Sequence, residues 1–111
     1  ISAETAEKLL EKARAFGAAE RLLIGGDAVV TEEAAAVFAK SQLKLLGNES
    51  QSVGPLDAPM KVHQILLGKE IVLLEGIVLT DIPEGRYFLN AAPLNTGGLE
   101  GSPCRAWLME V

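Results

Sequence analysis

His63 is the only histidine in the sequence and the first residue whose type suggests chemistry. Imidazole changes its protonation near neutral pH and binds borderline metals, so His63 is a candidate general acid or base and a candidate metal ligand. Its neighbours on a predicted short helix are apolar, which is also typical of an imidazole at the edge of a core. The local sequence therefore leaves a chemical role and a structural role open for His63.

Glu75 interrupts an apolar stretch that runs from Ile71 to Leu79. A stretch that is apolar on both faces predicts a central strand covered on both sides. A carboxylate buried there is costly unless a cation, a metal or hydrogen-bond donors offset its lost hydration. In the other interpretation, Glu75 lies at a strand end or bulge beside Gly76 and reaches water.

The ligands of a conventional zinc site are not all present. Such a site takes about three or four ligands from Cys, His and carboxylate side chains. This sequence has one His and one Cys, far apart along the chain. A metal would have to be held by carboxylates alone or by ligands from another chain.

The remaining reactive residue types favour structural roles. Cys104 is expected to be a buried structural cysteine, because the only candidate base, His63, is distant in sequence. Arg105 favours an ion pair or a carbonyl contact over a substrate carboxylate. Ser52 has no evident base partner and no nucleophile elbow around it. The glycine loop 97–101 lacks the Lys and Ser/Thr of a phosphate-binding loop.

Apolar periodicity and turn residues predict the elements that must position these side chains. Two to three helices are expected, over residues 2–16, 31–41 and 59–67, with Ser2 and Thr31 as caps. Short strands are expected over residues 21–24, 43–46, 70–74, 77–79, 86–92 and 104–109. Strand, helix and strand over residues 21–46 indicate a βαβ unit with a parallel pair. Residues 48–60 form a long loop, either functional or a plain connector, and residues 95–103 form a flexible glycine-rich connection.

Length and composition limit the kinds of protein that this chain can be. With 111 residues, it is expected to form a single α/β domain over residues 1–111. The net charge of −5, with no basic cluster, argues against binding to nucleic acid. No apolar run approaches the roughly 20 residues of a membrane span, and no signal peptide is visible, so we expect a cytoplasmic protein. The chain begins with Ile1 rather than Met, which fits a processed product or a piece of something longer.

Four stretches together resemble the C-terminal portion of the cyclase family of metal-dependent hydrolases, which includes kynurenine formamidases and isatin hydrolases. Their order and spacing match across nearly the whole chain, and their combination is more specific than any one of them. The stretches are Thr31–Ala35 leading into Leu45–Val53, then Val62–Leu67, then Ile71–Gly76, and last Ala92–Leu94 followed by Glu100–Ala106.

The resemblance implies a swivelling β/β/α fold with a mixed, partly barrel-like sheet. It also implies that His63 acts in proton transfer near a metal and that Glu75, twelve residues later, is a metal ligand. The metal in the family is zinc or manganese, and it activates a water that attacks an amide, formamide or lactam carbonyl.

Two departures from the family pattern bear on function. The family's His- and Asp-rich metal motif has no counterpart in this sequence, and Asn48 stands where the family commonly has Asp. We therefore expect a C-terminal fragment or subunit of an amidohydrolase that holds no metal tightly and shows no hydrolysis alone. Its expected partner is a second copy or a complementary chain. The alternative is a non-catalytic, truncated relative that self-associates or binds a small molecule.

Overall fold

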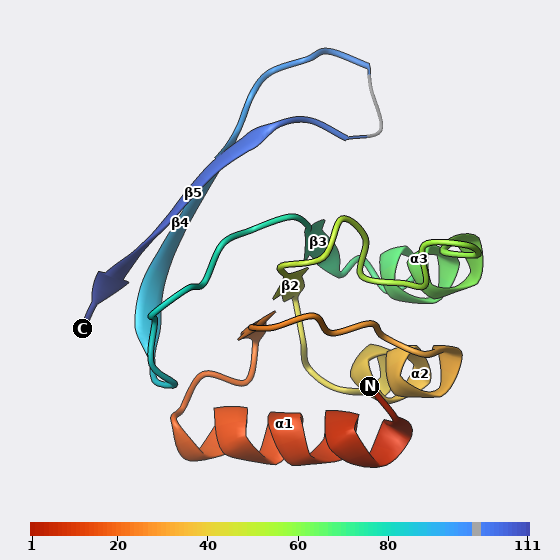
Figure 1. Cartoon of the computed structure of the whole chain (residues 1–111), viewed down its shortest axis with the longest axis horizontal. Coiled ribbons are helices and arrows are strands. Elements are labelled where there is room, and N and C mark those ends of the chain that lie inside the picture. The colour runs from red at the N-terminus through yellow and green to blue at the C-terminus, as the bar shows by residue number, and fades with distance from the viewer. Residues whose placement is uncertain (99–100) are drawn as a thin grey trace.

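The computed structural model describes residues 1–98 and 101–111. Figure 1 shows helices beside a small parallel sheet, and a long two-stranded hairpin that extends away from them. Leu99 and Glu100, which belong to the expected glycine-rich connection, lie outside the described residues. In chain order the elements are α1 (Ala3–Ala15), β1 (Arg21–Ile24), α2 (Glu32–Lys40), β2 (Leu45–Asn48), α3 (Met60–Leu67), β3 (Val72–Leu74), β4 (Tyr87–Pro93) and β5 (Cys104–Glu110). The predicted α/β class is confirmed.

Hydroxyl caps begin the first two helices, as the sequence predicts. Ser2 Oγ accepts a hydrogen bond from Thr5 N at 3.1 Å, and Thr31 Oγ1 accepts one from Ala34 N at 3.2 Å. These bonds satisfy backbone N–H groups that have no partner within the helix. Helix α1 ends before Gly17, whose φ of +71° is a left-handed conformation that glycine adopts without strain.

The parallel sheet has the strand order β1-β2-β3. Strands β1 and β2 pair from Arg21 opposite Leu45 to Ile24 opposite Asn48, which confirms the predicted parallel pair. The second strand begins at Leu45 and not at Leu43 as predicted. Leu43 still belongs to the turn after α2, where its backbone N donates to Ser41 Oγ at 3.1 Å.

Strand β3 differs from its prediction in both position and length. It lies at an edge of the sheet and not at the centre, and its Val72 side chain is 57% exposed. Residues 77–79, which were also predicted as strand, form none. The chain leaves the sheet at Gly76, where φ is +70° and the backbone N donates to Ser50 O at 2.8 Å.

The core lies between the helices and one face of the parallel sheet. Phe38 of α2 is the largest of its fully buried side chains. On the other face of the central strand, a methyl group at Gly47 would lie 2.5 Å from Leu23 Cδ2, so close packing requires glycine there. The buried cluster is Ala6, Leu10, Ile24, Val30, Ala34, Ala35, Phe38, Leu43, Leu46, Val53, Val62, Leu66 and Ile71.

Strands β4 and β5 form an antiparallel hairpin, with Tyr87 opposite Glu110 and Pro93 opposite Cys104. Over the described residues, the parallel and antiparallel strands form two separate sheets and not one mixed sheet. Cys104 is exposed, so its expected burial is wrong: it lies on a hairpin that projects from the body, and no described helix or strand outside the hairpin covers that end (Figure 1). In the described part of the chain, no helix has the length and apolar character needed to cross a membrane.

Candidate functional site

The candidate site lies where strands β2 and β3 end. In parallel sheets, ligands bind beyond the carboxyl ends of the strands, because the loops that leave those ends converge there. Asn48 is the last residue of β2, and Glu75 directly follows β3. The loop after β2 supplies Ser52, and helix α3 supplies His63 from one side. Four segments of the chain therefore contribute polar side chains to this edge of the sheet.

His63 and Glu75 are in direct contact. His63 Nε2 lies 3.0 Å from Glu75 Oε2 and 3.3 Å from Ser52 Oγ. Glu75 Oε2 also accepts a hydrogen bond from Val53 N at 2.8 Å. The His63 and Glu75 side chains are 29% and 28% exposed, so the carboxylate is partly desolvated but has donors to offset the cost. We call Ser52, His63 and Glu75 the His63 cluster.

Each of the two interpretations of Glu75 is right in part. Glu75 lies at a strand end beside Gly76, and it also meets a histidine and a backbone donor instead of only water. The structure thus brings together the two residues singled out from the sequence. The roles of His63 in proton transfer and of Glu75 as a metal ligand stay predictions.

Ser52 is the member of the cluster that the sequence analysis set aside for want of a base partner, which is wrong because its Oγ lies 3.3 Å from His63 Nε2. Its side chain is buried, and its Oγ accepts a hydrogen bond from Gly54 N at 3.3 Å. Gly54 packs so tightly that a methyl group there would lie 3.1 Å from Val62 Cβ, which holds this loop against α3. The sequence feature that pointed to this loop as functional was its length, from residue 48 to residue 60. The cluster is not a serine-hydrolase triad, because Ser52 and Glu75 contact the same nitrogen of His63.

Asn48 explains one departure from the family pattern. Its side chain is 1% exposed, and its Nδ2 donates to Ala28 O and to Ser52 O, each at 3.1 Å. An aspartate carboxylate in the same place would face two carbonyl oxygens and could donate to neither. Asn48 Oδ1 is buried and has no hydrogen-bond partner among the described residues. The amide therefore holds the carbonyl of Ser52, and with it the start of the loop.

Glu49 ties together the segments that flank the site. Its Oε1 accepts a hydrogen bond from Gly26 N at 2.7 Å, and its Oε2 accepts one from Leu79 N at 2.8 Å. These two backbone donors, Leu79 first and then Gly26, lower the pKa of the Glu49 carboxyl below its ordinary value of 4.5. The ionised carboxylate thus holds the turn after β1 and the segment after β3 at fixed positions.

We expect Glu49 to make the fold more stable near neutral pH than in acid. Because its pKa is lower in the folded chain, its contribution is present above 4.5 and is lost as the pH falls through the folded pKa. Urea unfolding of Glu49→Gln should show a loss of stability near neutral pH that shrinks in acid. The control is Glu11→Gln, an exposed glutamate on α1. Equal losses in acid and at neutral pH would contradict this assignment.

The residues described by the structure do not fit a complete metal site. Among them, no group of three or more His, Cys, Asp or Glu side chains is close enough to hold a metal. His63 and Glu75 are two candidates where zinc takes about three or four. Cys104 lies exposed on the hairpin, and Arg105 next to it finds no ionic partner in the described part of the chain, so its expected ion pair is not seen.

Known proteins resemble this chain in sequence over about two thirds of its length. The kynurenine formamidase of Salinibacter ruber is 43% identical over 74 residues, which are 66% of this chain and 35% of the relative. The kynurenine formamidase of Sphingopyxis alaskensis is 37% identical over 75 residues, 67% of this chain and 36% of the relative. Cyclase-like protein 2 of Oryza sativa is 37% identical over 71 residues, 63% of this chain and 26% of that protein. No family model matches the chain.

Solved structures resemble the fold as well. One, described as a potential metal-dependent hydrolase with cyclase activity, has a TM-score of 0.68 and 34% identity, and the match covers 72% of this chain and 40% of that one. A predicted metal-dependent hydrolase from Bacillus stearothermophilus has a TM-score of 0.67 and 34% identity, covering 72% and 39%. The chain therefore spans roughly a third of the length of the curated relatives that it matches.

Proposed function

We propose that this chain, which is homologous to kynurenine formamidases and cyclase-like proteins over about 65% of its length, contributes His63 and Glu75 to the active site of a metal-dependent amide hydrolase. The observation that carries the proposal is the 3.0 Å contact between His63 Nε2 and Glu75 Oε2 at the carboxyl ends of the parallel strands. The substrate class is an amide, formamide or lactam.

In this proposal, the His63 cluster moves a proton. The Glu75 carboxylate accepts from Val53 N and faces His63 Nε2, so it fixes the ring and stabilises the imidazolium when His63 takes up a proton. Ser52 Oγ, at 3.3 Å from the same nitrogen, limits rotation of the ring. When Nε2–H donates to Glu75, Nδ1 is the ring nitrogen that takes the proton from an attacking water and gives it to a leaving amine.

The metal, zinc or manganese in the family, requires ligands beyond the two that this chain offers. We propose that they come from polypeptide outside these 111 residues, either an adjoining segment or a complementary chain. The described residues would then form the C-terminal part of a swivelling β/β/α fold. The matched relatives support this proposal because they are about three times longer than the region they share with the chain.

The test is a completed protein, in which this chain is joined to the part of the Salinibacter ruber kynurenine formamidase outside the shared 74 residues. We expect stoichiometric zinc or manganese and hydrolysis of N-formylkynurenine. Glu75→Gln should lower metal affinity at least about tenfold, because losing even an outer partner of a metal ligand costs that much. The control is Asp57→Asn, an exposed carboxylate in the 48–60 loop. An unchanged metal affinity in Glu75→Gln would refute the proposal.

The second candidate is a non-catalytic relative that self-associates. It is favoured by apolar side chains on the projecting hairpin: Phe88 is 55% exposed, Met109 52% and Trp107 43%. Clusters of such side chains mark interaction surfaces. A completed protein that is folded and oligomeric but stays free of metal in excess zinc and manganese would support this candidate over the first.

A further inference from the structure

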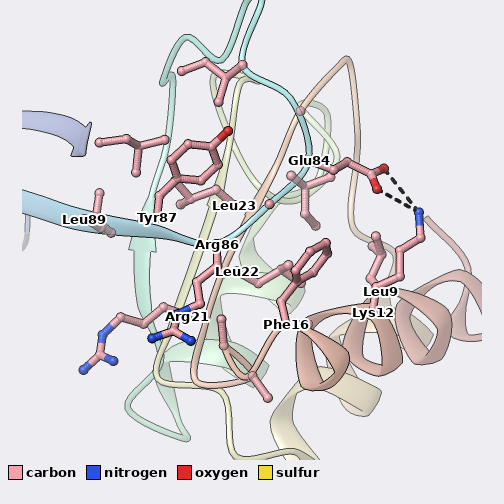
Figure 2. Close-up of a pocket in the computed structure, with 18 of the residues that line it drawn as sticks. Leu9, Lys12, Phe16, Arg21, Leu22, Leu23, Glu84, Arg86, Tyr87 and Leu89 are labelled. Atoms are coloured by element: carbon pink, nitrogen blue, oxygen red, sulfur yellow. Dashed lines mark hydrogen bonds and ion pairs between the residues drawn. The ribbon is translucent and has the colours of Figure 1, made fainter. Parts of the chain in front are cut away.

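A cavity lies beside strand β1, away from the His63 cluster. Its volume is about 830 Å³, and it is lined by residues of α1, β1, the segment before β4, and the hairpin. Figure 2 shows Leu9, Phe16 and Leu22 on one side of it and Tyr87 and Leu89 on the other. We propose that this cavity is a groove for an extended polypeptide segment that adds to the parallel sheet beside β1.

The first support for this proposal is the free edge of β1. Over the described residues, β1 pairs only with β2, so the outward backbone N–H and C=O groups of Arg21–Ile24 have no strand partner. Those residues line the cavity. An unpaired edge recognises an extended chain through its backbone, whereas a small ligand would satisfy few of these groups.

The second support is the incomplete burial of the apolar walls. Leu22 and Leu23 of β1 are only half-buried, as are Leu89 and Leu108, a directly opposed pair on the hairpin. A two-stranded hairpin is at best marginally stable without further packing. A segment lying between β1 and the hairpin would bury both pairs of leucines and would place the two sheets against a common strand.

The third support is the charge around the groove. Three cationic side chains, Lys12, Arg21 and Arg86, line this cavity together with two anionic ones, Glu20 and Glu84. Arg21 lies 3.9 Å from Glu20, which leaves Arg86 as the lining cation without an ion pair among the described residues. Lys12 Nζ is bound to Glu84 at 3.1 and 3.2 Å, which joins α1 to the segment before β4 (Figure 2). Arg21 and Arg86 lie on the same side of the cavity in Figure 2. The segment is therefore expected to be apolar in its middle and acidic near Arg86.

The shape of the groove argues against a second copy of this chain as its occupant. In Figure 2, Leu22 of β1 lies between Phe16 at the end of α1 and Tyr87 of the hairpin, and all three line the cavity. For two β1 edges to pair, a second copy would have to bring its own helix and hairpin into the same space. A single extended segment without flanking helices can reach the β1 edge. The inference rests on the proposed function in one respect: the segment would belong to the polypeptide that supplies the remaining metal ligands.

The test uses the ¹⁵N-labelled chain and a short blocked peptide in which Val and Thr alternate between terminal Glu residues. We expect saturable amide shifts along Arg21–Ile24. Hydrogen exchange should slow at Leu23, whose amide faces away from β2, and not at Leu22 or Ile24, whose amides face β2. The same peptide with every backbone nitrogen methylated should produce neither effect, since it has no donors for the β1 edge. Arg86→Glu should weaken binding about fivefold, and Arg14→Glu, an exposed arginine of α1 with the same change in charge, should leave it unchanged.

Three outcomes would overturn the proposal. One is the absence of saturable shifts at millimolar peptide, and another is equal binding of the methylated peptide, which would indicate a pocket for small apolar molecules. The third is a set of concentration-dependent shifts at β1 without peptide, which would indicate self-association. The measurement needs neither metal nor hydrolysis, so its failure is distinguishable from failure of the proposed function.

Discussion

Hydrolysis of N-formylkynurenine by the completed protein is expected to fall at least about a hundredfold when His63 is replaced by Asn. A positioned general acid or base contributes roughly 10²- to 10⁴-fold to a rate. Asn is smaller than imidazole and cannot accept and release a proton near neutral pH. Because His63 is the only histidine in the chain, no other imidazole of these 111 residues can take over its role.

The control for this variant is Lys61→Gln, an exposed position on the same helix. It alters α3 without touching the His63 cluster and should retain full activity. Circular dichroism and urea unfolding of both variants would show that the fold is intact. A loss below about tenfold in His63→Asn, or an equal loss in Lys61→Gln, would show that His63 has no part in proton transfer.

Replacing Phe38 by Ala is expected to cost about 3–5 kcal/mol of unfolding free energy, the usual range for a buried phenylalanine. Phe38 is 0% exposed and is packed among the helices and the face of the sheet. Domains of this size are stable by roughly 5–15 kcal/mol, so the variant should lose a large part of its stability. Because α2 packs against α3, the loss should also weaken the support of His63.

Phe16→Ala is the matched control, because Phe16 is the same residue type with 45% of its surface exposed. Urea unfolding of the two variants gives the comparison directly. Phe16→Ala should lose well under half as much stability as Phe38→Ala. Equal losses would mean that the core is centred elsewhere than between the helices and the parallel sheet.

The local elements could be predicted from the sequence because their signals are local. Ser2 and Thr31 precede runs with helical spacing, and both cap their helices as expected. Residues 21–24 are short, apolar and followed by two glycines, and they form β1 within the predicted bounds. Such patterns involve neighbours in sequence, so no knowledge of the tertiary fold is needed to interpret them.

The predictions that were wrong concern features that depend on contacts between distant parts of the chain. The apolar run around Glu75 indicated a central strand, but β3 ends at Leu74 and lies at an edge of the sheet. Cys104 has the sequence context of a buried residue, yet the hairpin on which it lies is uncovered at that end. Hydrophobicity shows that a residue can be buried, and not whether another element will cover it.

The reactive residues of the site could be predicted from the sequence, but the residues that hold them in place could not. The single histidine and the carboxylate within an apolar stretch were visible from residue type alone, and they are in contact. The contacts of Ser52 and Asn48 were not predicted: Ser52 was set aside, and Asn48 was noted only as a departure from the family pattern. Their roles depend on how a loop folds back onto α3 and onto the segment after β1. Hydrogen bonds between residues that are far apart in sequence leave no periodic signal.

The most direct test of the account is the position of the metal in a crystal of the completed protein soaked with manganese. Anomalous scattering locates the ion without any assumption about its ligands. We predict a peak at coordination distance, about 2.0–2.2 Å, from a carboxylate oxygen of Glu75, with the His63 ring beside it. A metal bound elsewhere, with both side chains facing only water, would contradict the assignment of this site.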